Sequence, residues 1–151
     1  MMNSSAKLIF INFILLTTCL GNVWCKVHVV IQNDLPAGTT LSVHCKSKQD
    51  DLGVQHITSS WEFSFKPNFW GATLFFCSFS WPGQFHWFDI SDQDRDEGDC
   101  NKCIWRIRSD RPCRFDGPTG VYDICYPWKL PSQLGRKVKD DVLNLYEYNL
   151  N

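Results

Sequence analysis

The chain has 151 residues, with 15 Lys plus Arg against 16 Asp plus Glu and a formal net charge of −1. This length favours a single domain, and the balanced charge excludes the strongly basic surface that is typical of nucleic-acid-binding domains, so we expect no nucleic-acid partner. With 44% hydrophobic and 15% aromatic residues, the composition also excludes general disorder. Eight cysteines indicate disulfides in a secreted protein, or metal ligands in a cytosolic one.

The first 25 residues have the layout of a secretory signal peptide. A short polar segment with one positive charge, Lys7, precedes the apolar run 8–20, which is too short to span a bilayer comfortably. We expect cleavage after Gly21 or after Cys25; a buried helix or an uncleaved anchor is the alternative. Because no later apolar segment is long enough to cross a membrane, we expect a secreted, extracellular protein that does not insert into membranes.

The remaining chain has the pattern of strands and turns. Alternation of apolar and polar residues, or dense β-branched and aromatic residues, predicts seven strands over 26–33, 41–45, 61–66, 73–81, 85–90, 103–108 and 121–126. Turn signals separate them, among them Asp34–Gly38, Pro82-Gly83 and Asp116–Gly120. The expected fold is all-β, a small antiparallel β-sandwich of about seven or eight short strands over 26–130, with a barrel as the alternative. The polar tail 131–151 is expected to form a short helix or to stay loose.

Aromatic residues are concentrated in the middle of the chain, with twelve Phe or Trp residues between Trp61 and Phe88. We expect most of them to form the core, because each buries a large apolar surface. The alternative is an exposed platform that stacks sugar rings, for which Phe69, Trp70 and Trp81 lie near turns.

Cleavage after Cys25 would leave six cysteines as disulfide candidates: Cys45, Cys77, Cys100, Cys103, Cys113 and Cys125. The Cys100-x-x-Cys103 motif fits a redox dithiol, half of a zinc site, or two half-cystines with separate partners. A redox dithiol needs a thioredoxin-like context that is missing, and zinc needs a second pair, so we favour separate partners. Spacing alone selects none of the fifteen connectivities, although Cys113 and Cys125 flank a turn and are expected to meet across a hairpin.

No motif for catalysis or for a cofactor is found. The four histidines lie in neither a Gly-x-Ser-x-Gly elbow nor a His-Glu-x-x-His helix, so we expect no enzyme, no cofactor and no metal site. The stretch Asp89–Asp99 holds six carboxylates against Arg95, but it fails as an EF-hand because Glu97 occupies the place of the required glycine. We interpret this stretch as a solvated loop, or as a recognition loop that favours a basic partner.

The chain contains an ordered series of short motifs between about residues 27 and 128. They are Val29-x-Ile31-x-Asn33-x-Leu35, Leu41-x-Val43-His44-Cys45 with the following residues to Gly53, Trp61-x-Phe63-x-Phe65, Thr73–Cys77, Phe88-Asp89, Cys100-x-x-Cys103-x-Trp105-x-Ile107 and Asp123-x-Cys125-Tyr126-x-Trp128. In this order the motifs resemble the plant self-incompatibility protein family, the S-protein homologues. Arg111 departs from the resemblance by replacing the glycine of an Asp-Gly-Pro-Cys motif.

The resemblance implies a secreted β-sandwich with disulfides and without catalytic residues. Founding members of the family are stigma-secreted signals that bind a pollen membrane protein, so we expect an extracellular signalling ligand for a cell-surface receptor; self-incompatibility itself is not implied. A defence or carbohydrate-binding protein is the alternative, and the oligomeric state stays open. Recognition in the family is attributed to the loops between strands. By position, the corresponding candidate residues of this chain are Lys46, Lys48, Asp50 and Asp51 in one loop and Asp92, Asp94, Arg95, Asp96 and Glu97 in another. Asp50 and Asp51 have a structural alternative, in which their carboxylates accept hydrogen bonds from turn amides.

Overall fold

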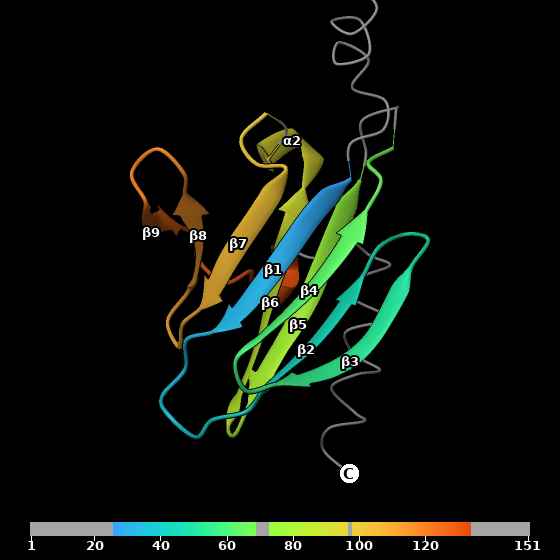
Figure 1. The fold of residues 1–151 in the computed structure, drawn as a ribbon. Helices are drawn as coiled ribbons and strands as arrows, with labels where there is room; N and C mark the ends of the chain where they lie inside the picture. The colour runs from blue at the N-terminus through green and yellow to red at the C-terminus, as the bar shows by residue number, and fades with distance from the viewer. Residues whose placement is uncertain (1–25, 69–72, 97, 134–151) are drawn as a thin grey trace, which may run out of the picture.

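A computed structural model describes residues 26–68, 73–96 and 98–133, and Figure 1 shows two packed β-sheets. One sheet has five strands in the order β4-β1-β7-β8-β9, and the other has four in the order β3-β2-β5-β6. The strands are β1 (Val27–Asn33), β2 (Leu41–Lys46), β3 (Asp51–Ile57), β4 (Ser60–Phe65), β5 (Leu74–Trp81), β6 (Gln84–Asp92), β7 (Lys102–Ile107), β8 (Pro112–Asp116) and β9 (Val121–Cys125). The only described helices are α2 (Gln93–Asp96) and a 3-10 turn at Pro131–Gln133.

The all-β sandwich predicted from the sequence is confirmed, with two differences. Strands β3 and β8 were not predicted. In β3 the sequence DLGVQHI shows no regular alternation and is mostly exposed, since this strand lies at a sheet edge, and β8 begins with a proline. The sandwich is also not purely antiparallel, because β1 and β7 pair in parallel with Val29 beside Cys103 and Ile31 beside Trp105.

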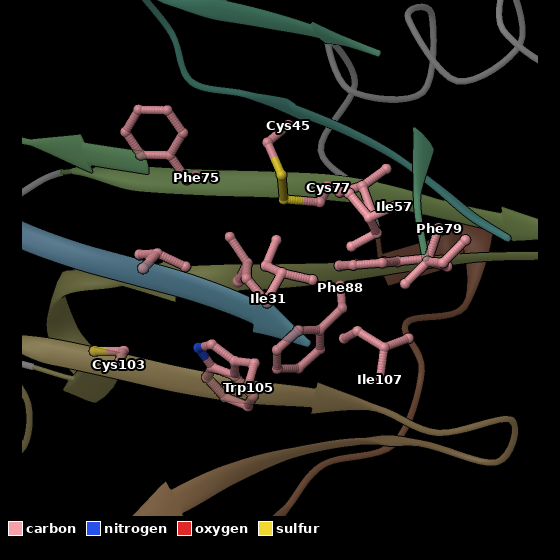
Figure 2. Close-up of a cluster of buried hydrophobic side chains, with 14 residues drawn as sticks. Ile31, Cys45, Ile57, Phe75, Cys77, Phe79, Phe88, Cys103, Trp105 and Ile107 are labelled. Carbon is pink, nitrogen blue, oxygen red and sulfur yellow. A yellow bond between two sulfur atoms is a disulfide. The ribbon is translucent and has the colours of Figure 1, made fainter. Parts of the chain in front are cut away.

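Alternating side chains from both sheets form one core, part of which Figure 2 shows. Val29 and Ile31 of β1 and Trp105 of β7 are fully buried, as the period-two pattern predicts. The aromatic residues of β4 and β5 interlock across the two sheets, with the rings of Phe65 and Phe75 4.6 Å apart. Most of the described aromatic cluster is therefore core, in agreement with the sequence-based expectation.

Three disulfides join the six candidate cysteines in the described chain. Cys45–Cys77 connects facing residues of β2 and β5, and Cys113–Cys125 connects β8 to β9 across the predicted hairpin. The third bridge, Cys100–Cys103, joins two cysteines with a sequence separation of only 3. The expectation that these two cysteines have separate partners is therefore wrong; the chain turns sharply enough before β7 for the two thiols to meet.

Residues 126–130, which we call the closing segment, cover the β6 side of the sandwich. Lys129 pairs with Trp87 through a backbone bridge, and its ammonium group forms an ion pair with Asp89. Tyr126 and Trp128 pack against the core. The predicted signal peptide and residues 134–151 of the predicted tail lie outside the described residues. Among the residues described, no helix has the length and apolar character needed to cross a membrane.

Candidate recognition site

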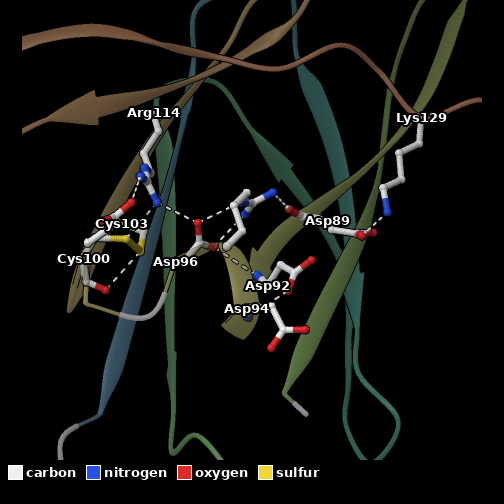
Figure 3. A network of polar contacts seen from close by, with 10 residues as sticks. Asp89, Asp92, Asp94, Asp96, Cys100, Cys103, Arg114 and Lys129 are labelled. Carbon is white, nitrogen blue, oxygen red and sulfur yellow. Dashed lines mark hydrogen bonds and ion pairs between the residues drawn. A yellow bond between two sulfur atoms is a disulfide. The ribbon is translucent and has the colours of Figure 1, made fainter. Parts of the chain in front are cut away.

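The acidic stretch of the sequence forms a turn at one end of the sandwich, which we call the acidic tip: Asp92, Asp94, Asp96 and Asp99 (Figure 3). Strand β6 continues through Asp89 to Asp92, so the predicted loop is shorter than the acidic stretch and its first residues are buried. The N–H of Asp94 donates to the Asp92 carboxylate at 3.1 Å, which starts the single turn of α2. A positive φ of 84° at Gly98 then allows the chain to reverse towards β7.

Asp96 is the centre of a buried ion network. Its carboxylate accepts two bonds from the Arg95 guanidinium, at 2.7 and 2.6 Å, and one from Arg114 Nη1 at 2.6 Å. It also accepts the backbone N–H of Asp92 at 3.0 Å. The side chains of Asp96 and Arg114 are only 6% and 3% exposed, so both charges are removed from water and depend on each other.

Arg95 connects the acidic tip to the aromatic core. Its guanidinium carbon lies 5.0–5.1 Å from the ring centroids of Phe88, Trp105 and Tyr126, within the range of a cation–π contact. Its Nη1 also donates to the backbone carbonyl of Asp89 at 2.9 Å. These contacts hold α2 against β6, β7 and the closing segment, so the carboxylates of the acidic tip stand on a rigid base.

The predicted members of this loop therefore have different surroundings. Asp94 is exposed and Asp92 half-buried, whereas Arg95 and Asp96 face inward. Glu97 lies outside the described residues. Asp99, which was not among the candidates, is 61% exposed and forms an ion pair with Arg114 at 3.0 Å. The described carboxylates of the acidic tip that reach solvent are thus Asp92, Asp94 and Asp99.

The other candidate loop, between β2 and β3, is held by its own polar side chains. Asp51 accepts hydrogen bonds from His44 Nε2 at 2.6 Å and from the Gly53 N–H at 2.9 Å, and Lys46 Nζ lies 3.2 Å from it. Although partial burial raises the pKa of Asp51, these bonds lower it to about 2. The Gly53 contact supports the structural alternative for Asp51.

Asp50 and Lys48 are exposed in this loop, as Asp51 is. The Asp50 carboxylate accepts a bond from Ser47 Oγ at 3.3 Å, and Ser47 Oγ in turn accepts the Asp50 N–H at 3.0 Å. Lys48 is exposed at the turn and stays a candidate for contact with a partner.

Both candidate loops leave the same end of the four-stranded sheet. Lys46 at the end of β2 faces Phe76 of β5, and Phe76 faces Asp89 of β6, three residues before Asp92. The structure therefore brings the two loops to one end of the molecule, with β5 between them. Which of their residues contact a partner stays a prediction.

The remaining candidate surfaces are partly buried or lie outside the described residues. Trp81, a candidate for sugar stacking, is half-buried, and its ring lies 5.1 Å from His86 and 6.3 Å from Trp128. Burial lowers the pKa of His86 from its ordinary value. Phe69 and Trp70 lie outside the described residues. Within the described ranges, no three His, Cys, Asp or Glu side chains come together in an arrangement that could hold a metal ion.

Sequence reasoning missed the partners of the acidic tip, namely Arg114 and the aromatic residues around Arg95. Arg114 sits on β8, which was not predicted, and its register opposite Trp105 turns it inward. The available signal was indirect: a lone arginine, Arg95, within a run of carboxylates is positioned to neutralise one of them.

Comparison with known proteins places the whole β-domain in one family. The family model "Plant self-incompatibility protein S1" matches residues 28–128. S-protein homolog 2 of Arabidopsis thaliana is 51% identical over 110 residues, and the match covers 68% of each chain. S-protein homolog 5 of the same plant is 47% identical over 106 residues, and the match covers 69% of this chain and 80% of that protein. A solved structure of SPH (Self-Incompatibility Protein Homologue) proteins, described as small, highly stable, secreted proteins from plants, overlaps with a TM-score of 0.48 at 21% identity, covering 70% of this chain and 96% of the other. The chain belongs to the plant self-incompatibility protein S1 family, the S-protein homologues.

Proposed function

We propose that this protein is a secreted, non-catalytic ligand that binds a basic surface of a cell-surface protein through its acidic tip. The observation that carries the proposal is the construction of that tip. Asp92, Asp94 and Asp99 reach solvent from a turn that buried ion pairs and a cation–π contact fix to the core. A rigid group of carboxylates is suited to recognition, because little conformational entropy is lost on binding.

Three further observations support the proposal. All six cysteines of the described domain are paired, which suits the oxidising environment outside the cell. The leader-like sequence at residues 1–25 agrees with export. Membership of the family connects the chain to proteins named for plant self-incompatibility.

The test compares two double variants that change the net charge equally. Asp92→Asn with Asp94→Asn removes two carboxylates from the acidic tip, whereas Glu62→Gln with Asp123→Asn removes two exposed carboxylates from strands β4 and β9. Fluorescently labelled protein is then titrated onto living plant cells at low and at physiological ionic strength.

We expect the tip variant to bind roughly tenfold more weakly at low salt, mainly through slower association, and the control variant to bind like the natural protein. Both variants should keep the far-UV circular dichroism spectrum of the natural protein. If the two variants bind equally well, the acidic tip is not the contact surface. A parallel Lys48→Glu variant reports separately on the β2–β3 loop.

A further inference from the structure

The Cys100–Cys103 disulfide differs in its position from the other two bridges. It joins the end of the acidic tip to the second residue of β7 and spans a sequence separation of only 3. The other two bridges connect neighbouring strands over separations of 32 and 12. Because the entropic gain from a disulfide grows with the size of the loop that it closes, this bridge contributes least to the stability of the fold.

The two sulfur atoms have unequal surroundings. Cys103 is fully buried beside Val29 of β1, whereas Cys100, which follows the acidic tip, is only half-buried. Arg114 Nη1 approaches Cys100 Sγ at 3.5 Å (Figure 3). A guanidinium next to sulfur favours the thiolate, and a reduced form that is stabilised in this way makes a disulfide easier to reduce. Cys113–Cys125 also joins a buried to a half-buried cysteine, but its guanidinium, that of Arg108, lies 3.4 Å from the buried sulfur of Cys113. In Cys100–Cys103 the guanidinium lies instead at the less buried cysteine, and this arrangement is suited to thiol–disulfide exchange.

We propose that Cys100–Cys103 is an exchangeable disulfide that external dithiols open and that the oxidised, disulfide form of the same reagents closes, and that its state controls the acidic tip. The exchange itself is independent of the binding role proposed above. The site differs from a thioredoxin-type enzyme, because the cysteines lie between α2 and a β-strand, and the chain is the substrate of the exchange.

The exchange proceeds in two steps that balance. A thiolate of the dithiol attacks Cys100 Sγ, the sulfur of the less buried cysteine; the Cys100–Cys103 bond breaks, and Cys103 Sγ takes the electron pair and then a proton. The second thiolate of the dithiol then attacks the reagent's other sulfur, the one bonded to Cys100 Sγ in the mixed disulfide. This attack releases Cys100 as a thiolate, which the Arg114 guanidinium stabilises. The dithiol is oxidised to a disulfide, and the chain gains two electrons.

Opening the bridge changes the charges of the acidic tip. While the bridge is closed, Arg114 donates hydrogen bonds to Asp96 at 2.6 Å and to Asp99 at 3.0 Å, in addition to its contact with Cys100. A thiolate at Cys100 adds a third anion to this guanidinium, and Asp99, the most exposed of the three, is the one that is released. The N–H groups of Asp99 and Cys100 both donate to the Asp96 carbonyl, so release of Asp99 also loosens that turn.

The fold is expected to survive this opening. Cys103 lies within β7, which pairs with β1 over six residue pairs and with β8 over three, and these ladders do not need the sulfur bond. The bridge that joins β2 to β5, Cys45–Cys77, is fully buried and is expected to resist reduction.

The test is stepwise reduction of the purified, fully oxidised chain with dithiothreitol, followed by alkylation and peptide mass spectrometry. We expect Cys100 and Cys103 to be alkylated at dithiothreitol concentrations at least tenfold below those that open the other bridges, with the circular dichroism spectrum unchanged. Reoxidation should restore the original peptide map. The proposal is overturned if Cys113–Cys125 opens first, or if all three bridges open together with loss of the fold.

Two matched variants test the role of the charge near the sulfur. Asp99→Asn removes the exposed carboxylate that shares Arg114 with Cys100, so it should accelerate the opening about threefold. Asp94→Asn makes the same change in net charge on a carboxylate that points away from Arg114 (Figure 3) and should leave the rate unchanged. Equal rates in the two variants would contradict the assigned role of Arg114.

Discussion

Replacing Asp96 by asparagine tests whether the ion network fixes the acidic tip. The change keeps the shape of the side chain but removes the charge that faces two guanidinium groups. Because Arg114 is 3% exposed, its charge is not re-solvated when its partner is neutralised. Breaking one buried ion pair typically costs 3–5 kcal/mol, and Asp99 still faces Arg114, so we expect a loss of about 3 kcal/mol in the free energy of unfolding.

The assay is urea unfolding of the disulfide-intact protein, followed by tryptophan fluorescence. The fluorescence reports directly on the network, because Trp105 lies against both arginines. Asp94→Asn, an exposed change on the same helix, should stay within about 0.5 kcal/mol of the natural protein. A cycle with Arg114→Met should show that the two losses are coupled by at least about 1 kcal/mol. A loss below about 1 kcal/mol for Asp96→Asn would refute the view that the network anchors α2.

Two further predictions concern polar side chains elsewhere in the fold. Asp51 has a folded pKa of about 2, below its ordinary 3.8, so its contribution to stability is present above pH 4 and is lost as the pH falls towards 2. Because the side chain is 53% exposed, solvent screening limits this contribution to below about 1 kcal/mol. Acid unfolding of Asp51→Asn should therefore show a shallower pH dependence between pH 4 and pH 2 than that of the natural protein. Asn33 donates from Nδ2 to the carbonyls of Thr39 and Ile57, at 2.8 and 3.0 Å, and accepts the Leu35 N–H, so Asn33→Ala should cost about 1–3 kcal/mol in urea unfolding; a cost near zero would show that water replaces all three bonds.

The two strands that the sequence does not predict, β3 at a sheet edge and β8 between β7 and β9, both lack a regular alternation of buried and exposed residues. In β2, apolar residues alternate strictly with polar ones, and in β7 buried residues alternate with more exposed ones although Ile104 is apolar, because one face packs on the core and the other meets solvent. Strand β3 has a partner on one side only, contains Gly53, and buries just Ile57. Its strand conformation comes from pairing with β2, a long-range contact that leaves little trace in the local pattern.

The Cys100–Cys103 bridge was mispredicted for a different reason. The expectation of separate partners followed from compartment and composition, which say that cysteines pair but not which ones. What decides the pairing is the turn between α2 and β7, where the N–H groups of Asp99 and Cys100 converge on the Asp96 carbonyl. That turn depends on Asp96 being buried by Arg114 from β8, so no local sequence pattern could reveal it.

Counting charges along the sequence also overstates the charge that the acidic tip presents to a partner. Of the carboxylates between residues 89 and 99, Asp89 is neutralised by Lys129, and Asp96 by two arginines. The described carboxylates that remain near solvent are Asp92, Asp94 and Asp99, and Asp99 is paired with Arg114 while the disulfide is closed. In the proposed binding mode, the oxidised protein contacts its partner mainly through two carboxylates, so we expect binding to depend only moderately on salt. Opening the Cys100–Cys103 bridge frees a third carboxylate, and the same binding should become steeper in its salt dependence. Both proposals can therefore be tested in one experiment, which measures how steeply the binding affinity falls with salt concentration for the oxidised and for the reduced protein.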